Sequence, residues 1–220
     1  MSERKQAQRG EPRLPMALAI IAVGVLYMFI PSDFRISTSA TIGYPVELLI
    51  LLTLLVIGDP GRIDREVPWL RVVTTIMLAT ITLATTVAVV RLVLGILQNA
   101  AFTSPTQLLT LGAIIWITNV IQFALWYWHL DAGGPAARVL GLQKSEPAFH
   151  FPEQGLPELK GEGWYPQFID YFALSFNTGT AFSSTDVAAI RHWAKLLMIC
   201  ESAISLTLVA LVVARAINIL

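Results

Sequence analysis

The chain is poor in charge. Only 14% of its 220 residues are Asp, Glu, Lys or Arg, against about 25% in soluble domains. Hydrophobic residues make up 55% of the chain, and several apolar runs are long enough to cross a bilayer. An integral membrane protein is therefore expected, with the lipid bilayer as its first partner. The 15 basic and 15 acidic residues balance, so no nucleic-acid partner is predicted.

Signals of catalysis and metal binding are also lacking. The single cysteine, Cys200, cannot form a disulfide within the chain. His129, His150 and His192 are too far apart in the sequence to indicate a metal site. The sequence contains no Gly-x-Ser-x-Gly, no His-Glu-x-x-His and no phosphate-binding loop. No catalytic residue, metal or cofactor is predicted, and a membrane-embedded enzyme built from distant helices is the most remote alternative.

Five apolar segments have the character of membrane spans. They cover about Leu14–Ile30, Tyr44–Ile57, Leu70–Leu97, Thr106–His129 and Trp193–Leu220. The second is short for a bilayer core, so its helix is expected to begin a few residues earlier. The first could instead be a secretory signal with a weak cleavage site at Thr38-Ser39-Ala40. That site lies far from the apolar run, which favours an uncleaved span.

The remaining segments suggest four regions. Residues 1–13 form a basic polar tail, 14–130 a four-span bundle, 131–165 an extramembrane loop, and 166–220 a final module. The loop is rich in Gly and Pro, so it is expected to be irregular apart from a short helix over Ala136–Leu142.

The final module begins with a segment too short to cross a membrane. Pro166–Asn177 is predicted to form about three helical turns, followed by a Ser/Thr/Gly-rich loop over Asn177–Asp186. Non-helical backbone at membrane depth is tolerated only where protein buries it or water lines it. The helix either re-enters the membrane or lies at its surface with a polar connector. The predicted fold class is an all-α integral membrane protein with about five transmembrane helices plus one short re-entrant helix.

This order of elements, over roughly residues 166–216, resembles the pore helix, selectivity filter and inner helix of the potassium-channel-like family. In that comparison Thr178 and Gly179 fall on the filter's threonine pair and Thr180 on its hydrophobic position. The Gly-aromatic-Gly-Asp part falls on Ala181, Phe182, Ser183 and Ser184. The inner-helix pattern falls on Lys195-Leu196-Leu197, Glu201 and Ser205, with serine in place of the hinge glycine. The same ending resembles a group of uncharacterised bacterial multi-span membrane proteins.

The filter-like stretch departs from the family pattern. Ala181 and Ser183 replace glycines whose φ values most residues avoid, and an alanine with φ > 0 is strained by about 1 kcal/mol or more. The resemblance therefore implies a pore of low or altered selectivity for ions or small solutes, with monovalent cations as candidates. It also implies a homo-oligomer, a tetramer by analogy. The alternative is a non-conducting scaffold that binds partners through residues 131–165.

Three acids are candidate pore-supporting residues. Glu201 lies within an apolar span, where a carboxylate is costly. It is either functional or hydrogen-bonded to the short helix and its loop, fixing the two elements together. Asp170 lies near the start of the short helix, where the helix dipole favours an acid, or it faces a basic group or a pore mouth. Asp186 is placed to cap a helical turn over Ala188–Ile190.

Other polar residues in the spans have structural interpretations. Arg91 is expected to extend to an interface, or to pair with Glu47 or Glu201. The threonines of the third span are expected to bond to their own helix. One face of the fourth span carries Asn119, Gln122, Trp126 and His129, which either bond between helices or line a polar path. Small residues in the last span favour close helix packing: Ser202, Ala203, Ser205, Ala210 and Ala214.

Basic residues suggest an orientation. They concentrate in the tail, in loop 58–71, in loop 131–165 and beside the last span, and such residues mark the cytoplasmic side. This predicts a bacterial-type inner-membrane protein with a cytoplasmic N-terminus and an external C-terminus. The channel resemblance implies the reverse for the last part, and both cannot hold with five spans.

Overall fold

A computed structural model describes residues 10–37, 40–98, 104–142, 145–156, 158, 164–180 and 186–219. It is mostly helical, at 77%. The longer helices are α1 (Leu14–Met28), α2 (Ala40–Gly58), α3 (Pro68–Leu97), α4 (Pro105–Leu130), α7 (Phe168–Thr180) and α8 (His192–Ile219). Shorter elements are η1 (Ser32–Phe34), η2 (Asp131–Gly133), α5 (Pro135–Val139) and η3 (Pro152–Gly155). The strands are β1 (Glu11–Pro12), β2 (Arg62–Ile63), β3 (Phe149–His150) and β4 (Ala188–Ala189).

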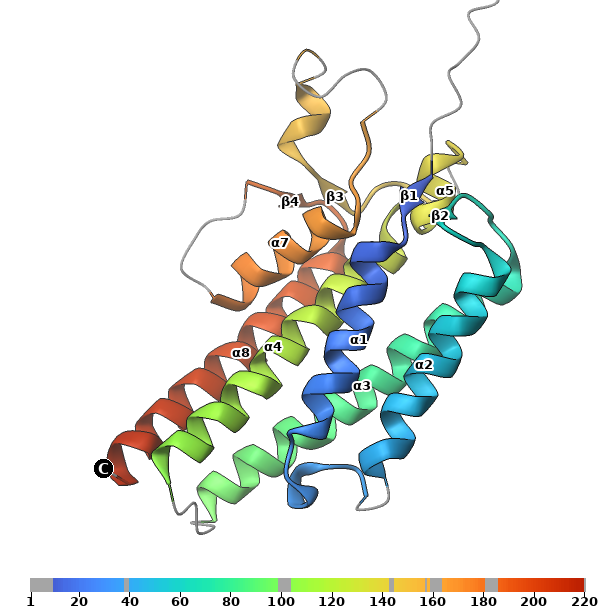
Figure 1. Cartoon of the computed structure of the whole chain (residues 1–220). Coiled ribbons are helices and arrows are strands. Elements are labelled where there is room, and N and C mark those ends of the chain that lie inside the picture. Colours follow the sequence, from blue (N-terminus) through green and yellow to red (C-terminus); the bar gives the residue numbers. More distant parts are fainter. Residues whose placement is uncertain are drawn as a thin grey trace, which may run out of the picture.

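Five of the described helices, α1, α2, α3, α4 and α8, lie side by side and alternate in direction (Figure 1). We call one end of this bundle the loop end. There α1, α3 and α8 begin and α2 and α4 end, and the segments between α4 and α8 gather beside them. At the far end α1, α3 and α8 finish and α2 and α4 begin. The N-terminal side of α1 and the end of α8 therefore lie at opposite ends of the bundle.

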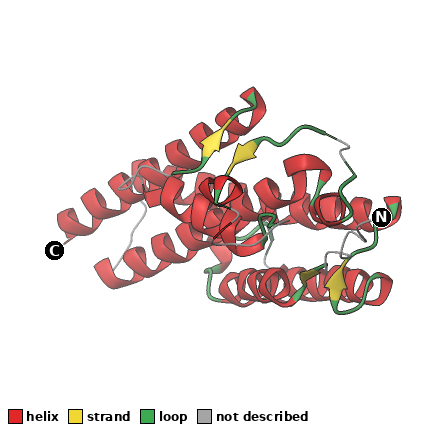
Figure 2. Cartoon of the chain, turned by 90° about the horizontal axis from the view of Figure 1, so that it is seen from above, coloured by secondary structure: helices red, strands yellow, loops and turns green. Residues whose placement is uncertain are grey.

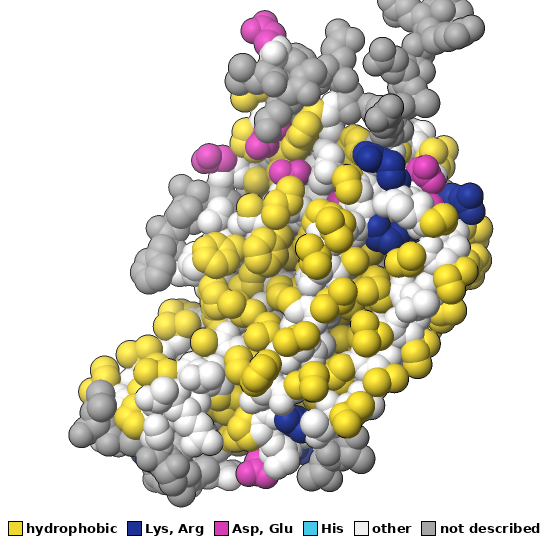
Figure 3. All heavy atoms as spheres, viewed as in Figure 1, with side chains coloured by type: hydrophobic (Ala, Val, Ile, Leu, Met, Phe, Trp, Pro, Cys, Tyr) yellow, Lys and Arg dark blue, Asp and Glu magenta, His cyan; other side chains and the backbone are white. Residues whose placement is uncertain are grey.

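Within the described part of the chain, four helices are long and apolar enough to cross a membrane: α2, α3, α4 and α8. The fifth predicted span, α1, is apolar but has 15 residues. Leu, Ile and Val side chains are exposed along these helices, as expected of a surface that faces lipid. Figure 3 shows apolar side chains over the middle of one face and charged ones towards its two ends. The expectation of a mostly helical chain with several helices able to cross a membrane is confirmed.

The predicted spans agree with the helices to within a few residues, and α2 does begin earlier than its apolar run, at Ala40. Proline stands in the first turn of α1, α3 and α4, where its missing N–H is not needed by the helix. One predicted boundary is wrong. The short helix α7 ends at Thr180 rather than Asn177, because the turn after Asn177 packs against neighbouring helices.

Two small antiparallel sheets lie at the loop end and are separate from each other (Figure 2). Strand β1 pairs with β2, and Arg13 bonds to Asp59 at 3.0 Å just beyond them. The last residues of the predicted polar tail are therefore part of the fold. Strand β4 pairs with β3, which corrects the helical turn predicted at Ala188–Ile190 and removes the capping role of Asp186. The short helix of the long loop, α5, covers only Pro135–Val139.

Helix α4 is the centre of the bundle. It packs against α1, α3, α7 and α8, and it is more deeply buried than α2, α3 and α8. Helices α4 and α8 approach closely at Gly112, where an added Cβ would lie 2.9 Å from the methyl groups of Val212. Glycine at this position allows the contact that keeps α8 against the bundle.

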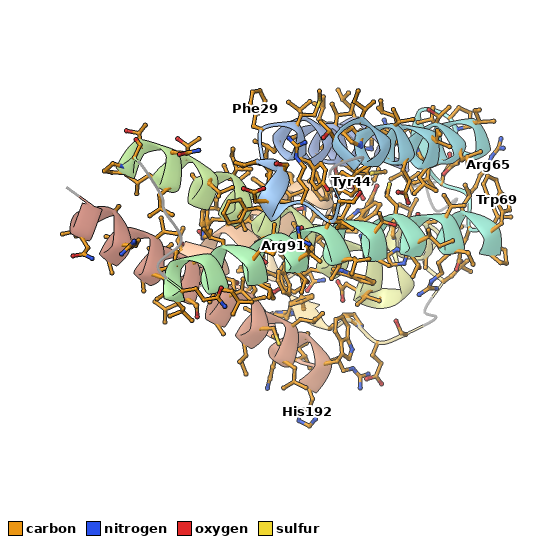
Figure 4. The ribbon with its side chains drawn as sticks, turned by 90° about the horizontal axis from the view of Figure 1, so that it is seen from below. Phe29, Tyr44, Arg65, Trp69, Arg91 and His192 are labelled. Carbon is orange, nitrogen blue, oxygen red and sulfur yellow. The ribbon has the colours of Figure 1, made fainter. Side chains whose placement is uncertain are left out.

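Arg91 lies on α3 (Figure 4) towards the far end of the bundle. Its guanidinium donates to the backbone carbonyls of Asp33 and Arg35 beside α1. Glu47 instead accepts from Thr80 at 3.3 Å. The predicted pairing of Arg91 with Glu47 or Glu201 is therefore wrong. Arg91 instead extends towards an end of the bundle, which was the other predicted alternative. The α3 threonines bond to carbonyls of their own helix as expected: Thr74, Thr75, Thr80, Thr82 and Thr85.

Candidate functional site around α7

Helix α7 runs from the loop end to the middle of the bundle. Its first residue, Phe168, packs edge-on against Trp128 near the end of α4. Near its last turn, the carbonyl of Gly179 accepts a bond from the indole of Trp116 at 3.4 Å. The 12 residues of α4 between these contacts rise about 18 Å at 1.5 Å per residue. The C-terminal end of α7 therefore lies close to the midpoint of α4.

The chain then returns to the end from which α7 started. Strand β4 follows α7 and pairs with β3, and Phe149 of β3 packs on Tyr127 and on Trp193 at the start of α8. The segment from α7 to α8 thus begins and ends at the loop end (Figure 1).

Two carboxylates anchor the first turn of α7. The Glu11 carboxylate, from the other end of the chain, accepts the backbone N–H of Phe168 at 2.5 Å and the indole N–H of Trp128 at 2.9 Å. Asp170 accepts the N–H of Gln167 at 2.8 Å. Free N–H groups and a positive dipole end make a helix start favourable for acids. Asp170 therefore acts as an acid at the start of its helix, one of its predicted roles.

Glu11 is 1% exposed. Its burial raises its pKa above the usual 4.5, although the bonds from Trp128 and Phe168 oppose this shift.

A third acid, Asp131, fixes the next turn of α7. Its carboxylate accepts the Tyr171 hydroxyl at 2.5 Å and the backbone N–H of Ala148 at 2.6 Å. Arg138 donates to the Asp131 carbonyl at 2.8 Å, and its guanidinium lies 4.9 Å from the centre of the Tyr171 ring. Through Asp131 the long loop and α7 are held to the end of α4.

Glu201 occupies the centre of the contact between α4, α7 and α8. Its side chain is fully buried. It bonds to the hydroxyl of Tyr127 on α4 at 2.5 Å and to the hydroxyl of Ser175 on α7. Among the described residues, no Arg, Lys or His forms an ion pair with it. Glu201 therefore joins the three helices by hydrogen bonds alone.

The hydrogen bonds of Ser175 indicate the protonation state of Glu201. The Ser175 oxygen lies 2.7 Å from the carbonyl of Val120, which can only accept, and it also bonds to Glu201. A serine hydroxyl has one proton to donate. Both bonds form together when Ser175 donates to Val120 and a protonated Glu201 donates to Ser175. This geometry suits the neutral acid, which is also the less costly form at membrane depth.

The last turn of α7 contains three residues that were predicted to lie in the filter-like loop. Thr178, Gly179 and Thr180 are helical instead. Their surroundings are protein: an added Cβ on Gly179 would lie 3.1 Å from Val120 and 3.2 Å from the Ser205 hydroxyl oxygen. Backbone approach to α4 and α8 explains the glycine here.

Carbonyls at this helix end are already bonded within the chain. Asn177 accepts from the Thr180 hydroxyl, Thr178 from the Ser202 hydroxyl, and Gly179 from Trp116. The Thr178 hydroxyl donates to the carbonyl of Leu174. Four candidate filter residues, Ala181, Phe182, Ser183 and Ser184, lie outside the described residues. Asp186 is exposed, between that segment and β4.

Three of the four residues on the predicted polar face of α4 bond to other helices, and the fourth, Gln122, is buried. Asn119 donates to Ser205, Trp126 donates to Thr82, and His129 bonds to Thr75 at 3.0 Å. The small residues of α8 divide into two sets. Ser202 and Ser205 contact α7 or α4, whereas Ala203, Ala210 and Ala214 are exposed.

Sequence reasoning found Glu201 but missed its partners and the two other buried acids that bond to α7, Glu11 and Asp131. Tyr127, Ser175 and Tyr171 are ordinary residues of apolar helices, and Glu11 lies in a segment that looked like a tail. One signal was available. A tyrosine in a very apolar helix needs a partner for its hydroxyl, and carboxylates in three other chain segments could supply one.

Comparison with protein-family models, curated proteins and solved structures finds no match. Within the described part of the chain, no three His, Cys, Asp or Glu side chains are grouped as metal ligands.

Proposed function

We propose that this protein is a channel-like membrane protein in which α7 is a re-entrant half-helix and several copies together enclose a path for ions or small solutes. The observation that carries the proposal is the course of α7. It enters from the loop end, stops near the midpoint of α4 and is followed by a return to the same end. Placed in a bilayer of about 30 Å, this course puts the end of α7 in the membrane interior.

A helix that ends at such a depth needs protein or water around its last turn, and a water-filled path between subunits supplies both. The buried anchors of α7, from Glu11 to Glu201, support the proposal because a half-helix in a pore must hold its position. Helix α8 lies at the side of the bundle away from α1 and α2 (Figure 4), and most of it is not buried within this chain. Its exposed alanines, Ala203, Ala210 and Ala214, are suited to close packing against a second copy. Monovalent cations are the proposed permeant species.

A second function is favoured by a specific observation. The carbonyls of Asn177, Thr178 and Gly179 are occupied by donors of the same chain, so they are poorly placed to replace the hydration shell of an ion. The alternative is a non-conducting membrane scaffold that keeps the half-helix as a packing element and binds partners through residues 131–165.

Ion flux in proteoliposomes containing the purified protein tests the proposal. Thr180 is half-buried at the end of α7, whereas Ala173 is exposed on the same helix. The pore proposal expects measurable cation flux, reduced in Thr180→Trp and unchanged in the matched control Ala173→Trp. Comparing potassium with sodium then measures selectivity, which is expected to be low.

A folded, membrane-inserted oligomer that passes no common ion would favour the scaffold. A monomer in detergent and in lipid would contradict the pore, since one half-helix and one adjoining helix cannot enclose a path. Gly179→Trp is unsuitable as a blocking variant, because its side chain would collide with Val120 and Ser205.

A further inference from the structure

A groove of about 700 Å³ opens at the loop end between the start of α3, the end of α4 and the start of α8. One part of its lining is charged: Arg71, Arg191 and Glu146. The other part is apolar and continues down α8: Leu130, Trp193, Leu196, Leu197 and Cys200. Neither Glu11 nor its partners Trp128 and Phe168 line this groove, so it is separate from the Glu11 anchor of α7's first turn.

We propose that this groove binds one anionic phospholipid of the surrounding bilayer. Its phosphate would lie against Arg71 and Arg191, and an acyl chain would follow the apolar face of α8. The inference is independent of whether the protein conducts.

The charges of the groove suit a phosphate. Arg71 is exposed in the first turn of α3, and no described residue bonds to its guanidinium. Among the described residues, Arg191 is paired only with Glu146, which is largely exposed. Two arginines and one glutamate leave a net positive charge. Arginine is a strong phosphate ligand because its planar group presents several donors, and basic pockets between membrane helices bind lipid headgroups.

The apolar wall suits an acyl chain. Leu196 is 61% exposed on α8 beside Trp193, whose ring is of the kind found at headgroup level. Cys200 lies nine residues beyond Arg191 in the chain, which is about 14 Å along a helix. A lipid with its phosphate at Arg191 would therefore have the first half of an acyl chain beside Cys200. The volume is within the usual range of small-molecule sites.

Cys200 provides the measurement, since it is the only cysteine of the chain and is exposed. The rate of its modification by a small apolar maleimide is measured on the purified protein in neutral detergent micelles, with phosphatidylglycerol or phosphatidylcholine added at a few molecules per protein. At this ratio the micelles present no charged bilayer surface that could attract the arginines non-specifically. We expect phosphatidylglycerol to slow modification and phosphatidylcholine to protect much less.

The variant Arg71→Gln/Arg191→Gln should need a higher phosphatidylglycerol concentration for the same protection, by about fivefold for each arginine removed. Lys195→Gln is the matched control, because Lys195 is exposed at the same end of α8 but does not line the groove. It should keep the protection of the original protein. Glu146→Gln should strengthen protection, since it frees Arg191.

Three results would overturn the proposal: no protection by phosphatidylglycerol, equal protection by phosphatidylcholine, or equal loss of protection in Lys195→Gln. Melting temperatures without lipid show whether each variant remains folded. Both arginines are on the surface, so no change is expected there.

Discussion

At the scale of single residues, the buried acids decide how α7 is held. Glu11, Asp131 and Glu201 come from three distant segments, and each accepts or shares bonds with hydroxyl, indole or backbone groups. Leaving a buried polar group without a partner costs more free energy than a typical hydrogen bond contributes to stability. Each acid is therefore strongly tied to the partners that surround it.

Glu201→Gln should preserve stability, whereas Glu201→Leu should not. Glutamine can donate to Ser175 and accept from Tyr127, as a protonated glutamate does. Leucine leaves the Tyr127 hydroxyl buried without its partner, at a cost of about 1–3 kcal/mol. Thermal unfolding in detergent measures both. Ile199→Leu, at an exposed position of the same helix, serves as control. Equal destabilisation by Gln and Leu would contradict a neutral Glu201.

Because of Glu11, the stability of the fold should decrease as pH rises. Because burial raises its pKa, the folded state holds the Glu11 proton more tightly than the unfolded state. The unfolding free energy should then fall as pH rises from about 4.5 through the higher folded pKa. Unfolding measured from pH 4 to pH 8 should show this decline, and Glu11→Gln should flatten it. An unchanged profile in Glu11→Gln would assign the pH dependence to another group.

At the scale of elements, α7 depends on close approach to its neighbours. Its inward face contains Ser175, Thr178 and Gly179, and its outward face includes Ile169 and Phe176. A helix of this length is marginal by itself. Its position is set by packing against α4 and α8 and by the carboxylates at its first turns.

Gly179→Leu should displace the last turn of α7, while Ala173→Leu should be tolerated. The larger side chain at 179 meets Val120 and Ser205, and overpacking typically costs about 1–3 kcal/mol. Limited proteolysis after α7, together with thermal unfolding, measures the effect. Equal behaviour of the two variants would mean that α7 is not packed as described.

At the scale of the whole molecule, the two ends of the bundle differ. Most described arginines lie at the loop end, and Arg35, Arg91 and Arg215 lie towards the other. The start of α1 and the segment between α4 and α8 share one end, and the end of α8 lies at the other (Figure 1). Basic residues favour a cytoplasmic loop end.

Reporter fusions measure this arrangement. A fluorescent protein at the N-terminus should be bright, and alkaline phosphatase after the end of α8 should be active. A phosphatase inserted at Glu158, which is exposed in the long loop, should be inactive. The reverse pattern at all three sites would agree with the fold but would mean that its orientation in the membrane is inverted. A mixed pattern, with the N-terminus and Glu158 on opposite sides, would contradict the fold itself.

The sequence by itself determined the class of molecule and its elements. Low charge and long apolar runs indicate helices able to cross a membrane, because a helix satisfies the polar groups of its own backbone within a bilayer. The same local signals placed the helix limits to within a few residues. They also identified Glu201 as unusual, since an acid in an apolar helix is costly wherever the helix lies.

Only the tertiary structure decided what α7 does with its polar residues. Thr178 and Gly179 resemble a filter in sequence, yet they lie in a helical turn packed on Val120, Ser202 and Ser205. Glu11 belongs to a polar segment by composition, yet it is buried against a helix that begins 157 residues later. Local sequence cannot reveal such partners, because a hydrogen bond between distant segments depends on how the helices pack and leaves no pattern in the spacing of either one.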